Sequence, residues 1–274
     1  MRWFNYADWK SILGMTLISV MAISEAAWGQ IGVSALSLDV NLSPGGSFAG
    51  NFEVFNNGQK PRQFTVVLKD YDRNIDGGLV LLTPGTHPRS LAKFFTLAPV
   101  AFTLSPGQKQ LIGINIKIPS TESGPHWVAL VITSPIPTVV TLGTDQQQTP
   151  VTIGSEEQFI VKIRQTDPTN AINKGRVTGT SVVLPEKDKP LQIVVEYENS
   201  GTTFQQPKAQ LRIVNAKGEI ALQKDVADLA VLPGGKLRLK IPVTQALPSG
   251  SYLALIIIDF GGDALVAGQV RFQL

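Results

Sequence analysis

The sequence predicts an all-β protein built from two tandem β-sandwich domains. Short runs of alternating apolar and polar residues recur along most of the 274 residues, as in strands that bury one face and expose the other. Glycine and proline, with 25 and 18 residues, separate these runs, which is typical of turns between short strands. Charged residues make up only 16% of the chain, against about 25% in soluble globular proteins, which argues against disorder and long solvated helices. The length fits two domains of about 100–150 residues each.

Residues 1–29 are expected to be a signal peptide. Arg2 and Lys10 flank a polar start, and residues 11–23 form an apolar run that is too short to span a bilayer, since a spanning helix needs about 20 apolar residues. Ala27-Trp28-Gly29 fits a cleavage site, so the mature chain would begin near Gln30. We therefore expect an exported, periplasmic protein. The alternative is an uncleaved signal, which would be its only attachment to a membrane.

Residues 30–166 are expected to form the first domain, and the spacing of its runs favours an immunoglobulin-like sandwich. Its apolar alternation is clearest in Leu36-Leu38-Val40, Phe52-Val54, Phe64-Val66-Leu68, Ile112-Ile114-Ile116-Ile118, Val128-Leu130-Ile132 and Phe159-Val161-Ile163. A short helix at residues 90–95 is compatible with this pattern but is not required by it.

Residues 167–274 are expected to form a second sandwich, after a polar linker that contains Pro168. Its strands are predicted at residues 192–197, 209–214, 237–243, 252–258 and 266–272.

A faint internal repeat supports this division. Asn57-Gly58 corresponds to Asn199-Ser200-Gly201, each after a predicted strand, and residues 104–108 (LSPGQ) correspond to residues 232–236 (LPGGK). A third pair of segments, SGPHW and SGSY, precedes an apolar strand in each domain. Gly, Asn and Pro supply the turn conformations at these points. The repeat indicates a common architecture and says nothing of a common function.

No catalytic or metal-binding constellation is visible. Cysteine is absent, which excludes disulfides, thiolate metal sites, a cysteine nucleophile and a lipoprotein anchor. The two histidines, His87 and His126, each lie beside a proline and are far apart in the sequence, and no G-x-S-x-G or H-E-x-x-H motif occurs. The net charge of +3 comes from scattered Lys and Arg, so a nucleic acid is not an expected partner. We expect a non-enzymatic protein without cofactor or metal.

Residues 72–78 (DRNIDGG) allow two interpretations. Asp72, Asn74 and Asp76 place oxygen atoms at alternate positions before a glycine, as calcium loops do, but Thr83 stands where such a loop needs a glutamate. A hairpin turn explains the same residues, because Asp, Asn and Gly tolerate a positive φ. We favour the hairpin and leave calcium binding open.

The last predicted strand of the first domain is the most informative segment. Phe159, Val161 and Ile163 share one face, and Lys162 and Arg164 lie on the other, next to the domain boundary. If this strand lies at a sheet edge, an extended partner chain could pair with it, and a cation beside it could bind a carboxylate. A plain core strand with exposed basic residues fits the same pattern.

Several segments of the first domain together carry a family likeness that covers most of residues 33–168. They are residues 52–61 (FEVFNNGQKP), 102–110 (FTLSPGQKQ), 118–123 (IPSTES), 127–135 (WVALVITSP), Pro137, and 158–164 (QFIVKIR) followed by Pro168. In this order they resemble the periplasmic pilus-assembly (fimbrial) chaperones, as a divergent member would.

The resemblance implies two immunoglobulin-like domains in a boomerang shape that bind secreted pilin-like subunits by donating a strand, and it points to an outer-membrane usher as a further partner. Carried over to this sequence, Phe159, Val161 and Ile163 would be the donated side chains. Lys162 or Arg164 would bind the carboxyl terminus of the subunit. One departure is that residues 34–40 (SALSLDV) contain no Arg or Lys, whereas the family has a basic residue in its first strand.

The leading hypothesis from the sequence is a chaperone of this kind. The alternative is an extracytoplasmic immunoglobulin-like module that serves structure or adhesion in the cell envelope.

Overall fold

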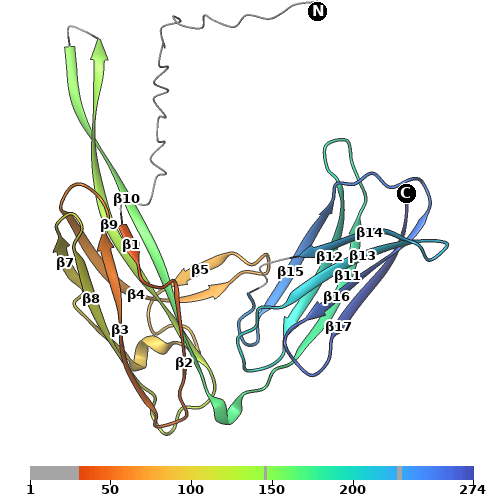
Figure 1. Cartoon of the computed structure of the whole chain (residues 1–274), viewed down its shortest axis with the longest axis horizontal. Helices are drawn as coiled ribbons and strands as arrows, with labels where there is room; N and C mark the ends of the chain where they lie inside the picture. Colours follow the sequence, from red (N-terminus) through yellow and green to blue (C-terminus); the bar gives the residue numbers. More distant parts are fainter. Residues whose placement is uncertain (1–30, 145–146, 227–229) are drawn as a thin grey trace, which may run out of the picture.

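The computed structural model describes residues 31–144, 147–226 and 230–274, so the expected signal peptide at residues 1–29 lies outside the described residues. The described chain consists of β-strands and two short 3-10 helices (Figure 1). No helix in this part of the chain has the length and apolar character needed to cross a membrane. The predicted all-β architecture of two sandwiches is confirmed.

The first sandwich consists of a four-stranded and a six-stranded sheet. The four-stranded sheet has the order β1 (Ile31–Val33), β3 (Ser47–Asn56), β8 (Lys109–Lys117) and β6 (Phe95–Ala98). The six-stranded sheet has the order β2 (Ser37–Asn41), β10 (Gln147–Thr166), β9 (His126–Thr144), β4 (Arg62–Arg73) and β5 (Leu79–Leu82), with β7 (Ala101–Leu104) paired to β4. Between the sheets lies one core of buried aliphatic and aromatic side chains, to which β8 and β9 each contribute alternate residues.

The predicted runs of the first domain coincide with β2, β3, β4, β8, β9 and β10. Leu36 lies just before β2 and is exposed, so it does not belong to the buried face. The strands β1, β5, β6 and β7 are not predicted, because three or four residues are too few to show an alternation. The optional helix at residues 90–95 is the 3-10 helix η1 (Leu91–Phe94), whose N-cap Ser90 accepts a hydrogen bond from the amide of Ala92.

The second sandwich consists of a three-stranded and a four-stranded sheet. The first has the order β11 (Gly175–Val183), β12 (Leu191–Asn199) and β15 (Lys236–Val243). The second has the order β14 (Ile220–Val226), β13 (Lys208–Asn215), β16 (Ser251–Asp259) and β17 (Val266–Gln273). The five predicted strands are β12, β13, β15, β16 and β17. The pattern misses β11, whose alternation is interrupted by a register shift between Val177 and Gly179, and β14, whose exposed and half-buried residues do not alternate.

The internal repeat has a structural counterpart, displaced by one residue from the predicted correspondence. Buried Asn56 donates from Nδ2 to the carbonyls of Lys60 and Leu104, and buried Asn199 donates in the same way to Thr203 and Val231. The side-chain oxygen of each Asn accepts the amide two residues later. Asn56, not Asn57, is therefore the partner of Asn199, and each Asn fastens two loops at the same end of its sandwich.

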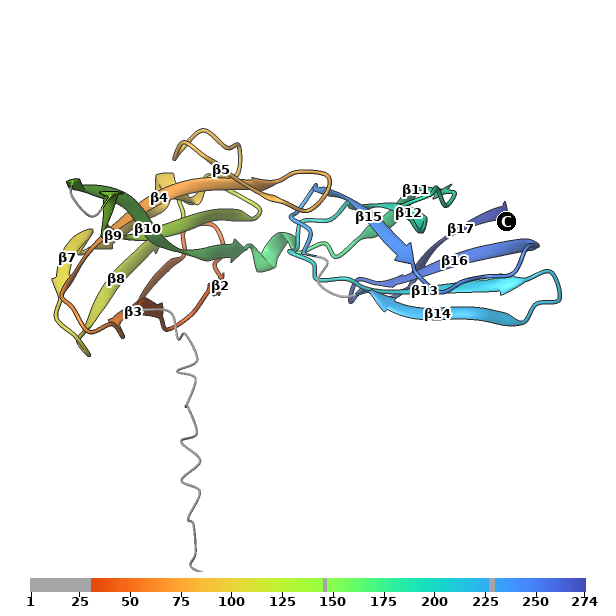
Figure 2. The same cartoon turned by 90° about the horizontal axis from the view of Figure 1, so that it is seen from above.

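The two sandwiches diverge from the 3-10 helix η2 (Pro168–Asn170), which connects them (Figure 1). The β4–β5 hairpin lies between the two sandwiches (Figure 1). Seen from above, the tip of this hairpin reaches β15 of the second sandwich (Figure 2). There the amide of Arg238 donates to the carbonyl of Ile75 at 2.6 Å, and Lys240 pairs with Asp76 at 2.9 Å. The hairpin thus forms a direct link between the two domains.

Candidate interaction edge and interdomain cleft

Strands β9 and β10 form a ribbon that is longer than the sheet to which it belongs (Figure 1). Their pairing runs without a register shift from His126 and Gln165 to Thr144 and Gln147. On the side of β9, strand β4 pairs only as far as Thr133. On the side of β10, strand β2 pairs only from Lys162 onward. Within the described residues, no strand pairs with the outer side of β10 over residues 147–161.

The direction of the free backbone groups on β10 follows from one hydrogen bond. The amide of Lys162 donates to the carbonyl of Leu36 at 3.0 Å, so the backbone of Lys162 points away from β9. In an antiparallel ladder, successive residues point their N–H and C=O groups to opposite sides. The even-numbered residues 152–160 therefore direct their donors and acceptors outward, and this segment is an open sheet edge.

Prolines close the opposite edge of the ribbon. Pro135 and Pro137 of β9 pair with Glu156 and Gly154, which both face away from β9. The two prolines therefore face away from β10, on the outer edge of β9 just beyond Thr133. Because proline has no N–H, this edge lacks two successive donors. Over residues 152–160 the edge of β10 can thus accept a further strand, whereas the edge of β9 resists one at Pro135 and Pro137.

The predicted contact residues of β10 lie on the two faces that the sequence indicated. Val161 and Ile163 are 1% and 0% exposed in the core of the first sandwich, and Phe159 packs partly buried against the same core. Val161 and Ile163 thus belong to the core of the first sandwich, and their role as donated side chains stays a prediction. Contact of Phe159 with a partner stays a prediction.

Lys162 and Arg164 face the second sandwich, as expected. Together with Arg73 they line a small pocket in the cleft between the domains, whose walls include Tyr71, Phe204 and Gln205. Arg164 lies 5.5 Å from the ring centre of Phe204 and forms a bidentate pair with Asp39 of β2, at 2.5 and 2.6 Å. Burial, and then the positive charges of Arg73 and Arg164, lower the pKa of Lys162. The cleft is therefore cationic on the side of the first domain.

Aromatic side chains fix the position of the cleft. Trp127 donates from Nε1 to the carbonyl of Tyr71 at 2.8 Å, and its ring meets Phe204 of the second domain edge to face, with centres 5.6 Å apart. Leu232 of the second domain joins the same buried cluster, and Ile160 of β10 packs partly buried against this cluster. The open edge of β10 thus ends at a cleft whose walls come from both domains.

Residues 74–78 form the turn of the β4–β5 hairpin that the sequence favoured, and Asp72 and Arg73 are the last residues of β4, paired with Val80 and Leu79. The side-chain oxygen of Asn74 accepts the amides of Asp76 and Gly78, and Gly77 has a φ of 85°. Asn74 thus satisfies the amides of its own turn, and Asp76 pairs with Lys240. Among the described residues, no group of three or more His, Asp or Glu side chains gathers as metal ligands would.

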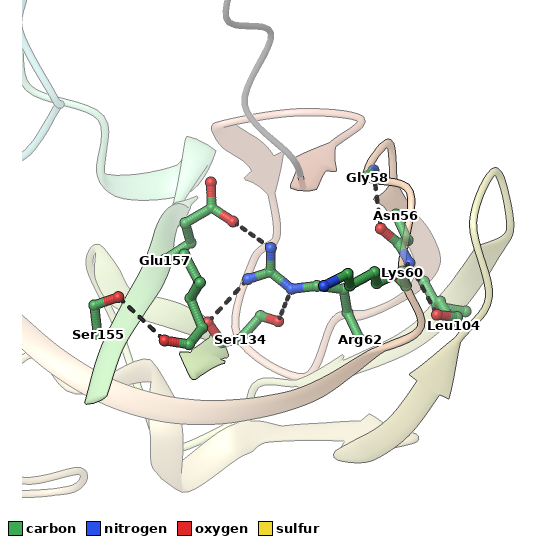
Figure 3. A network of polar contacts seen from close by, with 9 residues as sticks. Asn56, Gly58, Lys60, Arg62, Leu104, Ser134, Ser155 and Glu157 are labelled. Carbon is green, nitrogen blue, oxygen red and sulfur yellow. Dashed lines mark hydrogen bonds and ion pairs between the residues drawn. The ribbon is translucent and has the colours of Figure 1, made fainter. Parts of the chain in front are cut away.

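A polar network at the base of the ribbon is not predicted by the sequence pattern (Figure 3). Buried Arg62 of β4 donates to the hydroxyl and the carbonyl of Ser134 on β9, and it pairs with Glu157 on β10 at 2.8 Å. Figure 3 shows its guanidinium between these two residues. One arginine thereby fastens both strands of the ribbon where they leave the sheet.

No protein-family model and no curated protein matches the sequence significantly. The solved structures similar to this chain include pilus-assembly chaperones, the family that the first-domain segments resemble. The YadV chaperone is 13% identical with a TM-score of 0.45, over 89% of this chain and 100% of that chain. The CsuC–CsuE chaperone–tip adhesion subunit pre-assembly complex, from archaic chaperone-usher Csu pili of Acinetobacter baumannii, is 8% identical with a TM-score of 0.47, over 88% and 97%.

The complex of the SafA pilin with the SafB chaperone of Salmonella enterica is 13% identical with a TM-score of 0.41, over 89% and 96% of the two chains. The fold itself is established by the strands and registers described above.

Proposed function

We propose that this chain is an exported, non-enzymatic, chaperone-like protein that captures secreted pilin-type subunits by pairing one of their strands with the outer edge of β10. The observation that supports this most strongly is the asymmetry of the ribbon. The edge of β10 presents free donors and acceptors over residues 152–160, whereas Pro135 and Pro137 close the edge of β9. An added strand would gain affinity from main-chain hydrogen bonds, and no catalytic group is needed.

The course of β10 gives the bound strand an end point. A strand added along residues 152–160 leads toward Lys162, where β2 takes over the pairing and the interdomain cleft begins. The cations of the cleft suit a carboxylate at the end of the captured chain. Lys162 and Arg73 are the candidates for this contact, since Arg164 is engaged by Asp39. The pilin-type client and the outer-membrane usher rest on the sequence resemblance of the first domain.

Proline substitutions test strand pairing at this edge. Glu156→Pro and Gln158→Pro each remove one outward N–H donor from β10, as Pro135 and Pro137 leave the outer edge of β9 without N–H donors. In co-expression with an exported pilin-type subunit, each variant should recover about tenfold less complex, because a lost main-chain bond and a steric clash both weaken the added strand. Val139→Pro is the matched control, because the backbone of Val139 faces the outer edge of β9.

The comparison contradicts the proposal if Glu156→Pro and Gln158→Pro retain the fold, shown by unchanged circular dichroism, and still recover as much complex as Val139→Pro. That result would favour the envelope module with structural or adhesive function.

A further inference from the structure

The cleft contains a carboxylate of the protein's own. Asp39 of β2 lies directly beside Arg164 in the parallel pairing of β2 with β10. Its two oxygens accept the Nε and Nη2 donors of Arg164, which is the arrangement that a bound carboxylate would adopt. The side chain of Asp39 is 61% exposed, whereas that of Arg164 is 17% exposed. The acid can therefore turn out into water, while the arginine stays in place.

Arg164 is also held from the side of the second domain. Its guanidinium lies over the ring of Phe204, and it lines the same pocket as Lys162 and Arg73. Arg73 is positioned by a hydrogen bond from Nη1 to the carbonyl of Gly77 at 2.6 Å. Three cations thus converge on one pocket. Asp39 does not line this pocket. It pairs with Arg164 and neutralises the charge of this one cation.

We propose that Asp39 is an internal competitor for the carboxylate of the client. This inference rests on the proposed function and adds a regulatory element to it. In the unbound protein Asp39 accepts both hydrogen bonds of the Arg164 guanidinium. An entering carboxylate therefore binds Lys162 and Arg73 first. It gains Arg164 only by displacing Asp39. Competition by Asp39 lowers the affinity of the cleft for the client carboxylate and makes release of the client easier.

Titration with acetate, the smallest probe with this chemistry, tests the competition. Binding is followed by NMR through the Nε–Hε signals of Arg73 and Arg164 and the side-chain signals of Lys162. Asp39→Asn preserves the shape of the side chain and removes its charge, and it should bind acetate about fivefold more tightly than the wild type, as expected for loss of a competing ion pair. Glu186→Gln is the matched control, because Glu186 pairs with Lys189 in the second sandwich and has the same charge.

The other outcomes of the titration are decisive as well. Equal acetate binding by Asp39→Asn and Glu186→Gln, or weaker binding by Asp39→Asn, overturns the inference. So does the absence of acetate binding in all variants, since no anion site would then exist. Loss of binding in Lys162→Gln, with tighter binding in Asp39→Asn, supports it. Strand pairing at residues 152–160 is measured without acetate, so a failure of the proposed function would appear separately, in the proline variants.

Discussion

The guanidinium of Arg62 lies 2.8 Å from the carboxylate of Glu157, at the point where the β9–β10 ribbon leaves the sheet (Figure 3). Arg62 is 7% exposed and Glu157 is 28% exposed, so water screens this pair only in part. Glu157 directly precedes Gln158, whose backbone belongs to the open edge. The pair therefore fixes the direction in which the open edge projects from the sandwich.

Arg62→Met should destabilise the fold by about 2 kcal/mol, because it leaves the partly buried carboxylate of Glu157 without its ion-pair partner. Lys109→Met is the control, since Lys109 forms an exposed pair with Glu53 and its loss should cost less than about 1 kcal/mol. Urea unfolding measures both. Equal losses of unfolding free energy would show that the Arg62 network stabilises the fold no more than an exposed ion pair does.

Asn56→Asp and Asn199→Asp should each cost about 2–3 kcal/mol, because the carboxylate cannot donate to the loop carbonyls and is buried as a charge. Exposed Asn57→Asp, one residue away from Asn56, should cost less than about 0.5 kcal/mol. Thermal unfolding of the three variants checks this. A cost at Asn57 as large as that at Asn56 would contradict the structural repeat.

Stability should fall as the pH drops below about 6.5, through His126. Burial lowers the pKa of His126, and the hydrogen bond with Gln165 only partly opposes this shift. Although Nε2 lies 3.7 Å from Glu122, the neutral ring forms no ion pair at pH 7. When the pH falls below the ordinary pKa of histidine, His126 binds a proton in the unfolded chain but not in the folded chain. The folded state therefore loses stability as the pH falls. Urea midpoints at about pH 7.5 and about pH 5.5 measure the loss, and His126→Gln should make it smaller. An unchanged loss would contradict this assignment.

Phe204→Ala should loosen the angle between the domains while both sandwiches stay folded. The ring of Phe204 packs against Trp127 and under Arg164, and alanine abolishes both contacts. X-ray scattering should then show a broader distribution of interdomain distances. Phe48→Ala, a change at the edge of the first core, should leave that distribution unchanged. A rigid Phe204→Ala variant would show that the hairpin contacts at Asp76 and Ile75 hold the domains by themselves.

The strands that could be predicted are those with one face in a single core. In β8, the alternation of Ile112, Ile114 and Ile116 is visible in the sequence because all three side chains are 1% exposed or less. The strand β14 could not be found in this way. Ile220 is 59% exposed, and the other residues of β14 are exposed or only half-buried, so no apolar face stands out.

The site was only partly predictable, because its key relationships join distant residues. Lys162 and Arg164 were found from local alternation, but the pairing of Arg164 with Asp39 spans 125 positions and depends on β2 running parallel to β10. Pro135 and Pro137 are plain in the sequence. The edge that they close follows only from the register of β9 with β10.

Hydrogen exchange at single amides of β10 measures strand addition most directly. In the free protein the outward amides of Gly154, Glu156 and Gln158 should exchange fast, and those of Ser155 and Glu157, which face β9, should exchange slowly. When a pilin-type subunit is bound, the three outward amides should become protected. If they exchange as fast in the complex as in the free protein, or if protection appears on the outer edge of β9 instead, the edge of β10 is not where this protein holds its client.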